Sequence, residues 1–244
     1  MKLIELENLS IQTTTNYLKQ YPEDAARRAK TEEKQISLIK NAYLKKILPN
    51  KQTTKPDYLV SELLEHLYQY PKEKRDFYQQ QYNQQKQTEM MIGQLLERYI
   101  INAAKDYGWV FTAECVKAVD FLKKEGSNWI PLQIKNSDNT ENSSASAIRN
   151  GTTIQKWFRR FSSPRVIEPK FKKDGTLSKV GFTKYPEEFK RRSEANDTTP
   201  FHTPEFNWEN FPDHEVKKIV SEHRFKQFIY DYLTGKTIFG TVSN

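Results

Sequence analysis

The sequence predicts an α+β or α/β fold in which a small mixed sheet is flanked by helices and preceded by a helical N-terminal part. Three observations support this prediction. Apolar residues recur at three- and four-residue steps through the first hundred residues, short β-rich runs occupy 109–135, and the helical period returns at 214–233. With 36% apolar and 13% aromatic residues among 244, the chain can bury a substantial core.

The N-terminal part is expected to consist of helices. Residues 23–48 and 57–70 both place Ile, Leu and Tyr side chains at helical spacing, and a Pro-containing break separates them. A Gln-rich run, residues 78–108, continues as a helix that becomes apolar from Met90 onward and stops near Gly108.

The sheet is expected from three short runs, WVFTA (109–113), VKAVDFL (116–122) and WIPLQIK (129–135). Gly126-Ser127 lies between the second and third runs. Glycine accepts the positive φ of the first central position of a type II′ turn, so these two residues predict a tight hairpin.

A turn centred on Gly126-Ser127 places Asp120 opposite Gln133. Side chains alternate along a strand, so Gln133 and Lys135 are expected on the face of Asp120. The opposite face is predicted to be apolar and to carry Val119, Phe121, Ile130, Leu132 and Ile134. One face of the hairpin therefore gathers Asp, Gln and Lys within reach of one hydrated divalent ion and a phosphate.

The remainder of the chain is less periodic. Residues 137–151 form a polar loop, and residues 152–162 (TTIQKWFRRFS) predict a helix with an aromatic face and a basic face. Residues 164–212 are expected to be loops with one or two short strands. Residues 214–233 predict a final helix, with Gly235 just past its end.

Positive charge is concentrated in one segment. The chain carries a net +8, and from Arg149 to Arg192 there are 13 Lys and Arg against 4 Asp and Glu, so the rest of the chain sums to −1. Such a segment favours a nucleic-acid partner, with an anionic membrane or a solvated surface as alternatives.

Several other classes of protein are disfavoured. The single cysteine, Cys115, and four histidines without metal-ligand spacing argue against an internal disulfide and against zinc. No run of 18 apolar residues and no phosphate-binding glycine loop occurs. We expect a cytoplasmic protein with no membrane partner and no small-molecule cofactor.

Asp120, the tripeptide Gln133-Ile134-Lys135 and Glu97 in GQLLERYI together resemble the PD-(D/E)xK nuclease superfamily, which includes most type II restriction endonucleases. The resemblance implies a restriction-endonuclease-like core, a Mg²⁺ cofactor and catalytic roles for Asp120, Gln133, Lys135 and Glu97. It also implies sequence-specific cleavage of both DNA strands, with 5′-phosphate and 3′-hydroxyl ends, by a homodimer. Asp120, Gln133 and Glu114 are the candidate metal ligands.

Gln133 is a departure from the usual motif, which has a carboxylate at this position. An amide can coordinate a metal through its carbonyl oxygen but supplies no charge. Some members of the superfamily are similar in using QxK, so the substitution is compatible with catalysis.

The segment after Lys135 has the residue types of a DNA-reading surface, because Asn and Arg pair with purine edges and Ser with either. A Ser/Asn-rich surface loop is the alternative interpretation. The candidate DNA-binding residues are Asn136, Ser137, Asp138, Asn139, Asn142, Ser143, Ser144, Arg149, Lys156, Arg159 and Arg160.

The predicted division of the chain is residues 1–85 as a helical part for dimerisation or DNA clasping, and 86–244 as the catalytic and DNA-recognition core. Three alternatives remain open at this point. Asp120 and Lys135 could form an ordinary cross-strand ion pair, the chain could be a structure-selective resolvase or repair nuclease, or it could be a catalytically silent DNA-binding protein.

Overall fold

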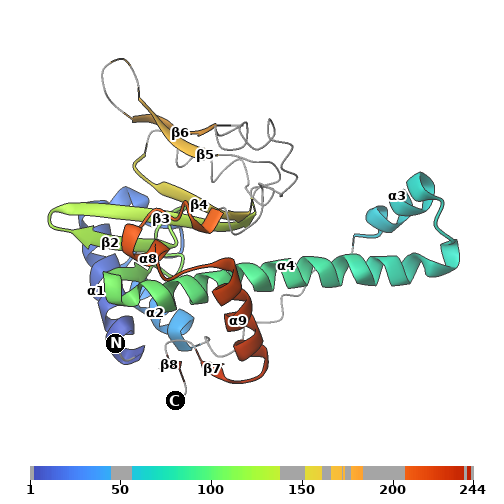
Figure 1. Cartoon of the computed structure of the whole chain (residues 1–244), viewed down its shortest axis with the longest axis horizontal. Coiled ribbons are helices and arrows are strands. Elements are labelled where there is room, and N and C mark those ends of the chain that lie inside the picture. Colours follow the sequence, from blue (N-terminus) through green and yellow to red (C-terminus); the bar gives the residue numbers. More distant parts are fainter. Residues whose placement is uncertain are drawn as a thin grey trace, which may run out of the picture.

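The computed structural model describes residues 3–44, 57–137, 152–160, 166–171, 173, 177–183, 207–238 and 241–242. Helices flank a small four-stranded mixed sheet, as the sequence predicts, so the mixed α and β fold class is confirmed (Figure 1). None of the described helices has the length and apolar character needed to cross a membrane.

The helices lie at both ends of the chain and frame the sheet. They are α1 (Leu3–Gln20), α2 (Glu32–Leu44), α3 (Tyr58–Tyr68), α4 (Arg75–Ala104), α8 (His214–Lys217) and α9 (Glu222–Leu233). Helix α4 contacts β1, β3 and α9, and α1 contacts β1, β2 and α2. In Figure 1, α3 and the first half of α4 project away from the rest of the molecule as an arm.

The main sheet has the order β1-β2-β3-β4. Its strands are β1 (Trp109–Phe111), β2 (Phe121–Glu125), β3 (Asn128–Ser137) and β4 (Gln155–Arg160). The first three strands are antiparallel, and β4 pairs with β3 in parallel, so the sheet is mixed. Two short antiparallel pairs follow, β5 (Val166–Phe171) with β6 (Leu177–Thr183) and β7 (Thr237–Ile238) with β8 (Thr241–Val242).

One continuous apolar core joins the sheet to α1, α2, α4 and α9. Its largest fully buried members include Trp157, Tyr43, Phe121, Phe225 and Leu122. Tyr43 comes from α2, Phe225 from α9 and the other three from the sheet, so elements from both ends of the chain share one core.

The predicted helix at 23–48 is wrong in its first part. A 3₁₀ turn at Pro22–Asp24 is followed by irregular chain, and α2 begins only at Glu32. Ala25 forms an isolated bridge with Val116, and the N–H of Ala26 donates to the carbonyl of Cys115 at 2.9 Å. These backbone bonds to the loop before β2 replace the helical ones, so tertiary contacts override a local helical preference.

The predicted helix at 152–162 is wrong, because residues 155–160 form strand β4. Trp157 and Phe158 are both buried, and they point to opposite faces of the sheet because they are neighbours on a strand. A strand covered on both faces has consecutive apolar residues, and this pattern is ambiguous between strand and helix.

The predicted final helix is divided in two. Helix α8 ends at Lys217, and α9 restarts at Glu222 with the Ser221 side chain accepting from the N–H of Arg224 at 3.1 Å. A serine cap satisfies the first donors of a new helix, which explains the interruption. The two strands β5 and β6 agree with the expectation for residues 164–212.

Candidate active site

The β2–β3 hairpin has the predicted register. Phe121 pairs with Leu132 and Glu125 with Asn128, so Asp120, one residue before β2, is in line with Gln133. Gly126 has φ +59°, as the first central position of a type II′ turn requires. The Gly-Ser turn therefore sets the register, and the register brings Asp120 to the middle of β3.

Asp120 is fixed through both its backbone and its side chain. Its N–H donates to the carbonyl of Leu132 at 2.9 Å, and its own carbonyl accepts from the N–H of Thr112 at 2.9 Å. Its Oδ2 accepts from the N–H of Ile134 at 2.8 Å. The carboxylate thus crosses from the end of β2 onto the Gln133-Ile134-Lys135 segment.

The chain leading to Asp120 has an unusual backbone. Ala113, Glu114 and Ala118 have φ values of 52°, 62° and 55°, in the left-handed region that residues with a side chain rarely adopt. Thr112 holds this loop closed, since its hydroxyl donates to the carbonyl of Val119 at 2.6 Å. Backbone strain of this kind concentrates at functional sites, where it positions a particular side chain.

Glu97 on α4 completes a cluster with Asp120 and Lys135. Burial raises the pKa of Glu97 well above its ordinary value, and the negative charge of Asp120 raises this pKa further, while Lys135 and Arg98 oppose the shift. Because the charges of Asp120 and Lys135 both affect the pKa of Glu97, its carboxyl group lies near both of them. The structure therefore brings together Glu97, Asp120 and Lys135, three of the four predicted catalytic residues. The fourth, Gln133, is in line with Asp120 on β3, two residues before Lys135, and is 3% exposed.

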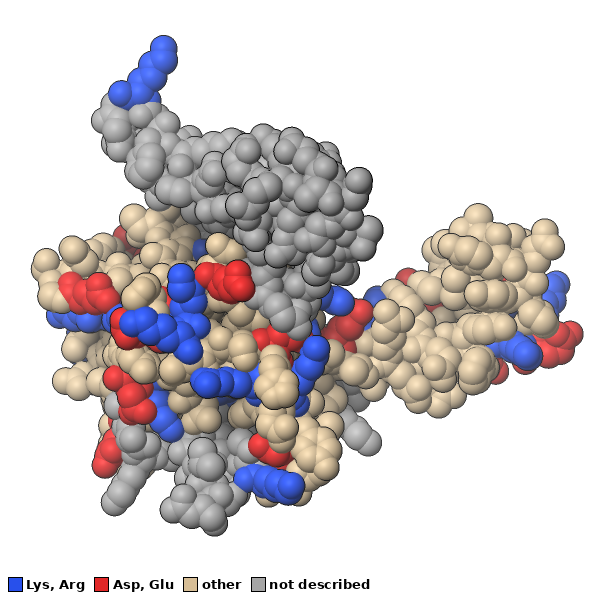
Figure 2. Space-filling model, in the orientation of Figure 1, with Lys and Arg blue, Asp and Glu red and all other residues tan. Residues whose placement is uncertain are grey.

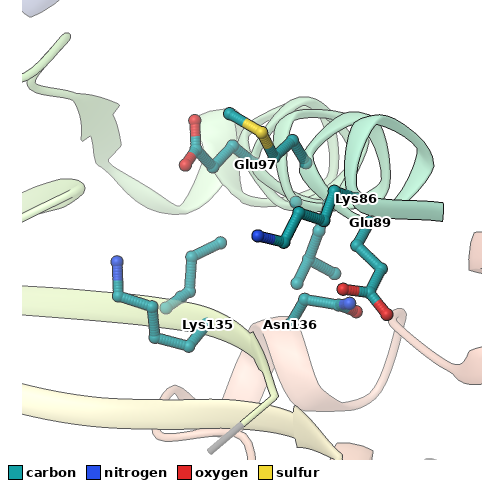
Figure 3. Close-up of a pocket in the computed structure, with 9 residues that line it drawn as sticks. Lys86, Glu89, Glu97, Lys135 and Asn136 are labelled. Atoms are coloured by element: carbon teal, nitrogen blue, oxygen red, sulfur yellow. The ribbon is translucent and has the colours of Figure 1, made fainter. Parts of the chain in front are cut away.

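A cavity of about 380 Å³ opens beside this cluster, between α4 and the end of β3. Its walls include Lys86, Glu89, Gly93 and Glu97 from α4 and residues 134–136 from β3. Figure 3 shows the ammonium groups of Lys86 and Lys135 directed into the space between the helix and the strand. The sequence interpretation missed Lys86 and Gly93, although both share the helical face of Glu97, eleven and four residues before it.

The side chains present are suited to a hard divalent cation. Asp120, Glu97 and the amide of Gln133 offer oxygen donors, the ligands that Mg²⁺ prefers. Burial and, after it, repulsion by Asp120 raise the pKa of Glu97, and a cation bound by both carboxylates would relieve the repulsion. Across the described ranges no group of three or more His, Cys, Asp and Glu side chains is placed to hold a metal, so the donor set would include Gln133 or water.

Glu114 lies in the strained loop and forms an ion pair with Arg28, which is not one of the candidate catalytic residues. Its carboxylate is 2.6 Å from a guanidinium nitrogen of Arg28, and both side chains are about two-thirds exposed, at 69% and 67%. Its charge still contributes to the raised pKa of Glu97, after the contributions of burial, Asp120, Lys135 and Arg98.

Arg159, on β4, connects β3 to the C-terminal helix α9. Its Nε and Nη2 donate to both carboxylate oxygens of Glu222 at 2.9 and 2.6 Å, and its Nη1 donates to Oδ1 of Asn136 at 2.8 Å. Trp208 also donates to Glu222, at 3.0 Å. This buried network fixes Asn136 directly after Lys135.

The other candidate DNA-binding residues fall into two groups. Ser137 is buried and paired in register with Arg160, which is exposed at the end of β4, and the ammonium of Lys156 lies 4.7 Å from the centroid of the Phe158 ring. Asp138, Asn139, Asn142, Ser143, Ser144 and Arg149 lie outside the described residues, as do many side chains of the basic segment 149–192.

Comparison with known proteins identifies the family. The family model of the SinI restriction endonucleases matches residues 18–191, which include Glu97, Asp120, Gln133 and Lys135. The chain belongs to the SinI restriction endonuclease family. This result confirms the type II restriction-endonuclease resemblance drawn from the motif.

Two relatives of the SinI family show the extent of the similarity. The type II restriction enzyme SinI of Salmonella infantis is 34% identical over 188 residues, which cover 76% of this chain and 65% of SinI. The type II restriction enzyme Eco47I of Escherichia coli is 31% identical over 230 residues, covering 89% of this chain and 83% of Eco47I. The aligned part of the chain thus spans slightly less than two thirds of SinI and most of Eco47I.

Proposed function

We propose that this chain is a type II restriction endonuclease that hydrolyses both strands of DNA within a specific sequence, with Mg²⁺, leaving 5′-phosphate and 3′-hydroxyl ends. The observation that carries the proposal is the cluster of Glu97, Asp120 and Lys135 around Gln133, in a chain whose relatives are type II restriction enzymes.

Asp120 and Glu97 are the proposed charged ligands of the ion, with the carbonyl oxygen of Gln133 as the neutral one and Glu114 as a further candidate. A bound Mg²⁺ supplies an activated water and neutralises charge on the phosphate. The bond from the Ile134 N–H to Oδ2 fixes the carboxylate of Asp120 before any ligand arrives, which lowers the entropic cost of ordering the site.

Lys135 is the proposed residue that stabilises negative charge on the phosphate. It is partly buried, lines the cavity, and points its ammonium toward the side of α4 that carries Glu97 (Figure 3). A fixed positive charge aimed at the phosphate favours the transition state, in which negative charge accumulates on the phosphoryl oxygens. The same ammonium can orient the attacking water by donating to it.

DNA is the proposed partner, and residues at the end of β3 and in the segment after it are proposed to contact its bases and phosphates. Asn136 and Ser137 are held in place by the strand, and Arg159 acts through Asn136. Lys156, Arg160 and Arg149 suit phosphate contacts, whereas Asp138, Asn139, Asn142, Ser143 and Ser144 suit hydrogen bonds to base edges. Arginine and lysine contacts of this kind would make binding strongly dependent on salt.

A homodimer in the cytoplasm is the proposed working form, because a two-fold protein can cut both strands of a symmetric site. The arm in residues 57–85 supports a contact role within the predicted N-terminal part, 1–85. It carries seven of the exposed large apolar side chains: Tyr58, Leu59, Leu63, Leu67, Tyr68, Tyr70 and Phe77. Figure 2 shows few charged side chains along the visible face of the arm, apart from its tip.

The test is digestion of one sequenced plasmid by the purified chain with Mg²⁺, followed by mapping of the ends. Discrete fragments whose ends share one short sequence are expected. Preferential cutting of branched DNA would instead indicate a structure-selective nuclease. Salt-sensitive binding without cleavage in any divalent metal would indicate a DNA-binding protein with a silent site.

A further inference from the structure

Gly93 occupies the interior of α4, a helix of 30 residues. Glycine is the least favourable residue in a helix interior apart from proline, so its presence there calls for a local reason. A Cβ built at Gly93 meets nothing within 4 Å among the described residues, and its φ is outside the left-handed region. Neither close packing nor backbone conformation within the described structure accounts for this glycine.

The position of Gly93 supplies the reason. It lies four residues before Glu97 and seven after Lys86, on the one helical face that lines the 380 Å³ cavity. Ile134, Lys135 and Asn136 form the opposite wall. A side chain at position 93 would therefore project into the cavity beside the catalytic cluster.

Lys86 marks the far end of the same wall. Its side chain is exposed, and its ammonium lies 4.4 Å from the centroid of the Tyr82 ring, which supports it from the same helix. Met90 and Leu96 contribute apolar surface between the two ends of the wall. Glu89 also lines the cavity, and its carboxylate accepts from the side-chain amide of Gln85 at 3.3 Å. Beside it the cavity combines a cation, an apolar floor and a position without a side chain. This combination suits a sugar-phosphate unit with an anionic phosphate and an apolar sugar face.

We propose that this cavity binds the sugar-phosphate unit next to the one that is cut, with Gly93 leaving room for the sugar and Lys86 contacting the phosphate. The inference rests on the proposed nuclease function and adds to it a second backbone subsite. Gly93 acts here by the absence of a side chain, so its role can be tested by adding atoms without removing any contact.

The first test compares Gly93→Ala and Gly93→Leu with the wild-type enzyme in single-turnover cleavage of a duplex carrying the mapped site. The cleavage rate is expected to fall about tenfold for alanine and about a hundredfold for leucine, because small displacements of the reacting phosphate are costly. The melting temperature is expected to rise by about 2–4 °C for alanine, because the helix gains a better former. Loss of activity with a gain in stability separates this role from misfolding.

Thr88→Ala is the matched control for the glycine variants. Thr88 is exposed on α4, does not line the cavity, and also gains helix propensity when it becomes alanine. Its cleavage rate is expected to equal that of the wild type. An equal loss of rate in Thr88→Ala and Gly93→Ala would assign the effect to helix rigidity and overturn the inference.

The second test measures binding of the same duplex without divalent metal as the salt concentration is varied. Lys86→Gln is expected to reduce the slope of log affinity against log salt by about one, as loss of one phosphate contact does. Lys40→Gln, which removes an exposed lysine from α2, is the charge-matched control and should leave the slope unchanged.

The outcomes separate the inference from the proposed function. Wild-type cleavage combined with wild-type rates in both glycine variants would overturn the subsite and leave the nuclease assignment intact. Absence of cleavage by the wild-type chain would overturn the proposed function, and the salt slope of Lys86→Gln would still decide whether the cavity binds a phosphate.

Discussion

The carboxylate of Asp120 accepts a hydrogen bond from the backbone N–H of Ile134, with 2.8 Å between Oδ2 and N. This bond joins the residue before β2 to the centre of the Gln133-Ile134-Lys135 segment. Asp120 therefore has two separable properties, its charge and its capacity to accept from β3. Variants that remove one property at a time distinguish a catalytic role from a structural one.

Asp120→Ala is expected to lower the free energy of unfolding by about 1–3 kcal/mol, because it leaves the N–H of Ile134 without this acceptor. Asp120→Asn keeps a side-chain oxygen that can accept the same bond, so a loss below about 1 kcal/mol is expected. Urea unfolding of both variants measures the difference. Equal losses would show that the bond contributes little to stability.

Gln133→Glu is expected to retain cleavage in Mg²⁺ and to make folding depend on the metal. The side chain of Gln133 is 3% exposed, so a carboxylate there would be buried near Asp120 and Glu97. Burial and repulsion would lower the melting temperature in a chelator, and Mg²⁺ would restore it by binding the folded state.

Thermal unfolding of wild type and Gln133→Glu, each with and without Mg²⁺, checks this prediction. Gln133→Ala is the control, because it removes the amide oxygen without adding charge, and its cleavage should be weaker than that of Gln133→Glu. If Mg²⁺ shifted the melting temperatures of wild type and Gln133→Glu equally, Gln133 would not be in a ligand position. The ligand role proposed for Gln133 would then pass to Glu114.

Glu222→Gln is expected to lower the free energy of unfolding by about 3–5 kcal/mol, because it leaves the guanidinium of Arg159 buried without its counter-charge. The two side chains are 0% and 14% exposed and share two hydrogen bonds. Glu32→Gln is the control, because the Glu32–Lys19 pair is exposed on both sides and its loss should cost less than about 1 kcal/mol. Similar losses in urea unfolding would contradict the structural role assigned to Arg159.

Asp213 is expected to make stability depend on pH in the acid range. Burial opposes ionisation of this residue, but the N–H of Val216 and the side chains of Lys123 and Trp109 outweigh it and lower the pKa of Asp213. A lowered pKa means that the folded state binds the proton less tightly than the unfolded state. The contribution is therefore complete above the ordinary aspartate pKa, near 4, and is lost as the pH falls through the lower folded-state value.

Asp213→Asn isolates this contribution. Its amide oxygen can still cap α8, but it does not titrate, so its free energy of unfolding should fall less than that of the wild type as the pH drops from about 6 to about 3. Urea unfolding at several pH values gives the two slopes. Parallel slopes would show that the pKa of Asp213 is the same in the folded and unfolded states.

The sequence predicted the hairpin register because a local rule governs it. The Gly126-Ser127 turn determines which residues pair, and alternation then places Asp120, Gln133 and Lys135 together. Glu97 was identifiable because GQLLERYI resembles the helix before the catalytic strands of PD-(D/E)xK nucleases, which often carries an acidic residue. The hairpin register depends on residues close in sequence, whereas the choice of Glu97 rests on the resemblance.

The features that the sequence did not predict depend on distant partners. The sequence of β4 has a helical pattern, and its strand conformation depends on pairing with β3. The irregular chain at 25–31 depends on the bridge between Ala25 and Val116. Nothing in the sequence distinguishes Arg159 from the other basic residues of its segment, because its partner Glu222 is 63 positions away. Burial against a distant element decides each of these cases, and a local pattern contains no information about it.

The most direct test of the central claim is single-turnover cleavage of a duplex carrying the mapped site, with Mg²⁺, by wild type, Asp120→Asn and Lys135→Ala. Both variants are expected to lose at least about a thousandfold in rate while remaining folded and bound to the duplex, because each removes a charge that acts on the phosphate. Cleavage by either variant at the wild-type rate would contradict the assignment of this cluster as the active site.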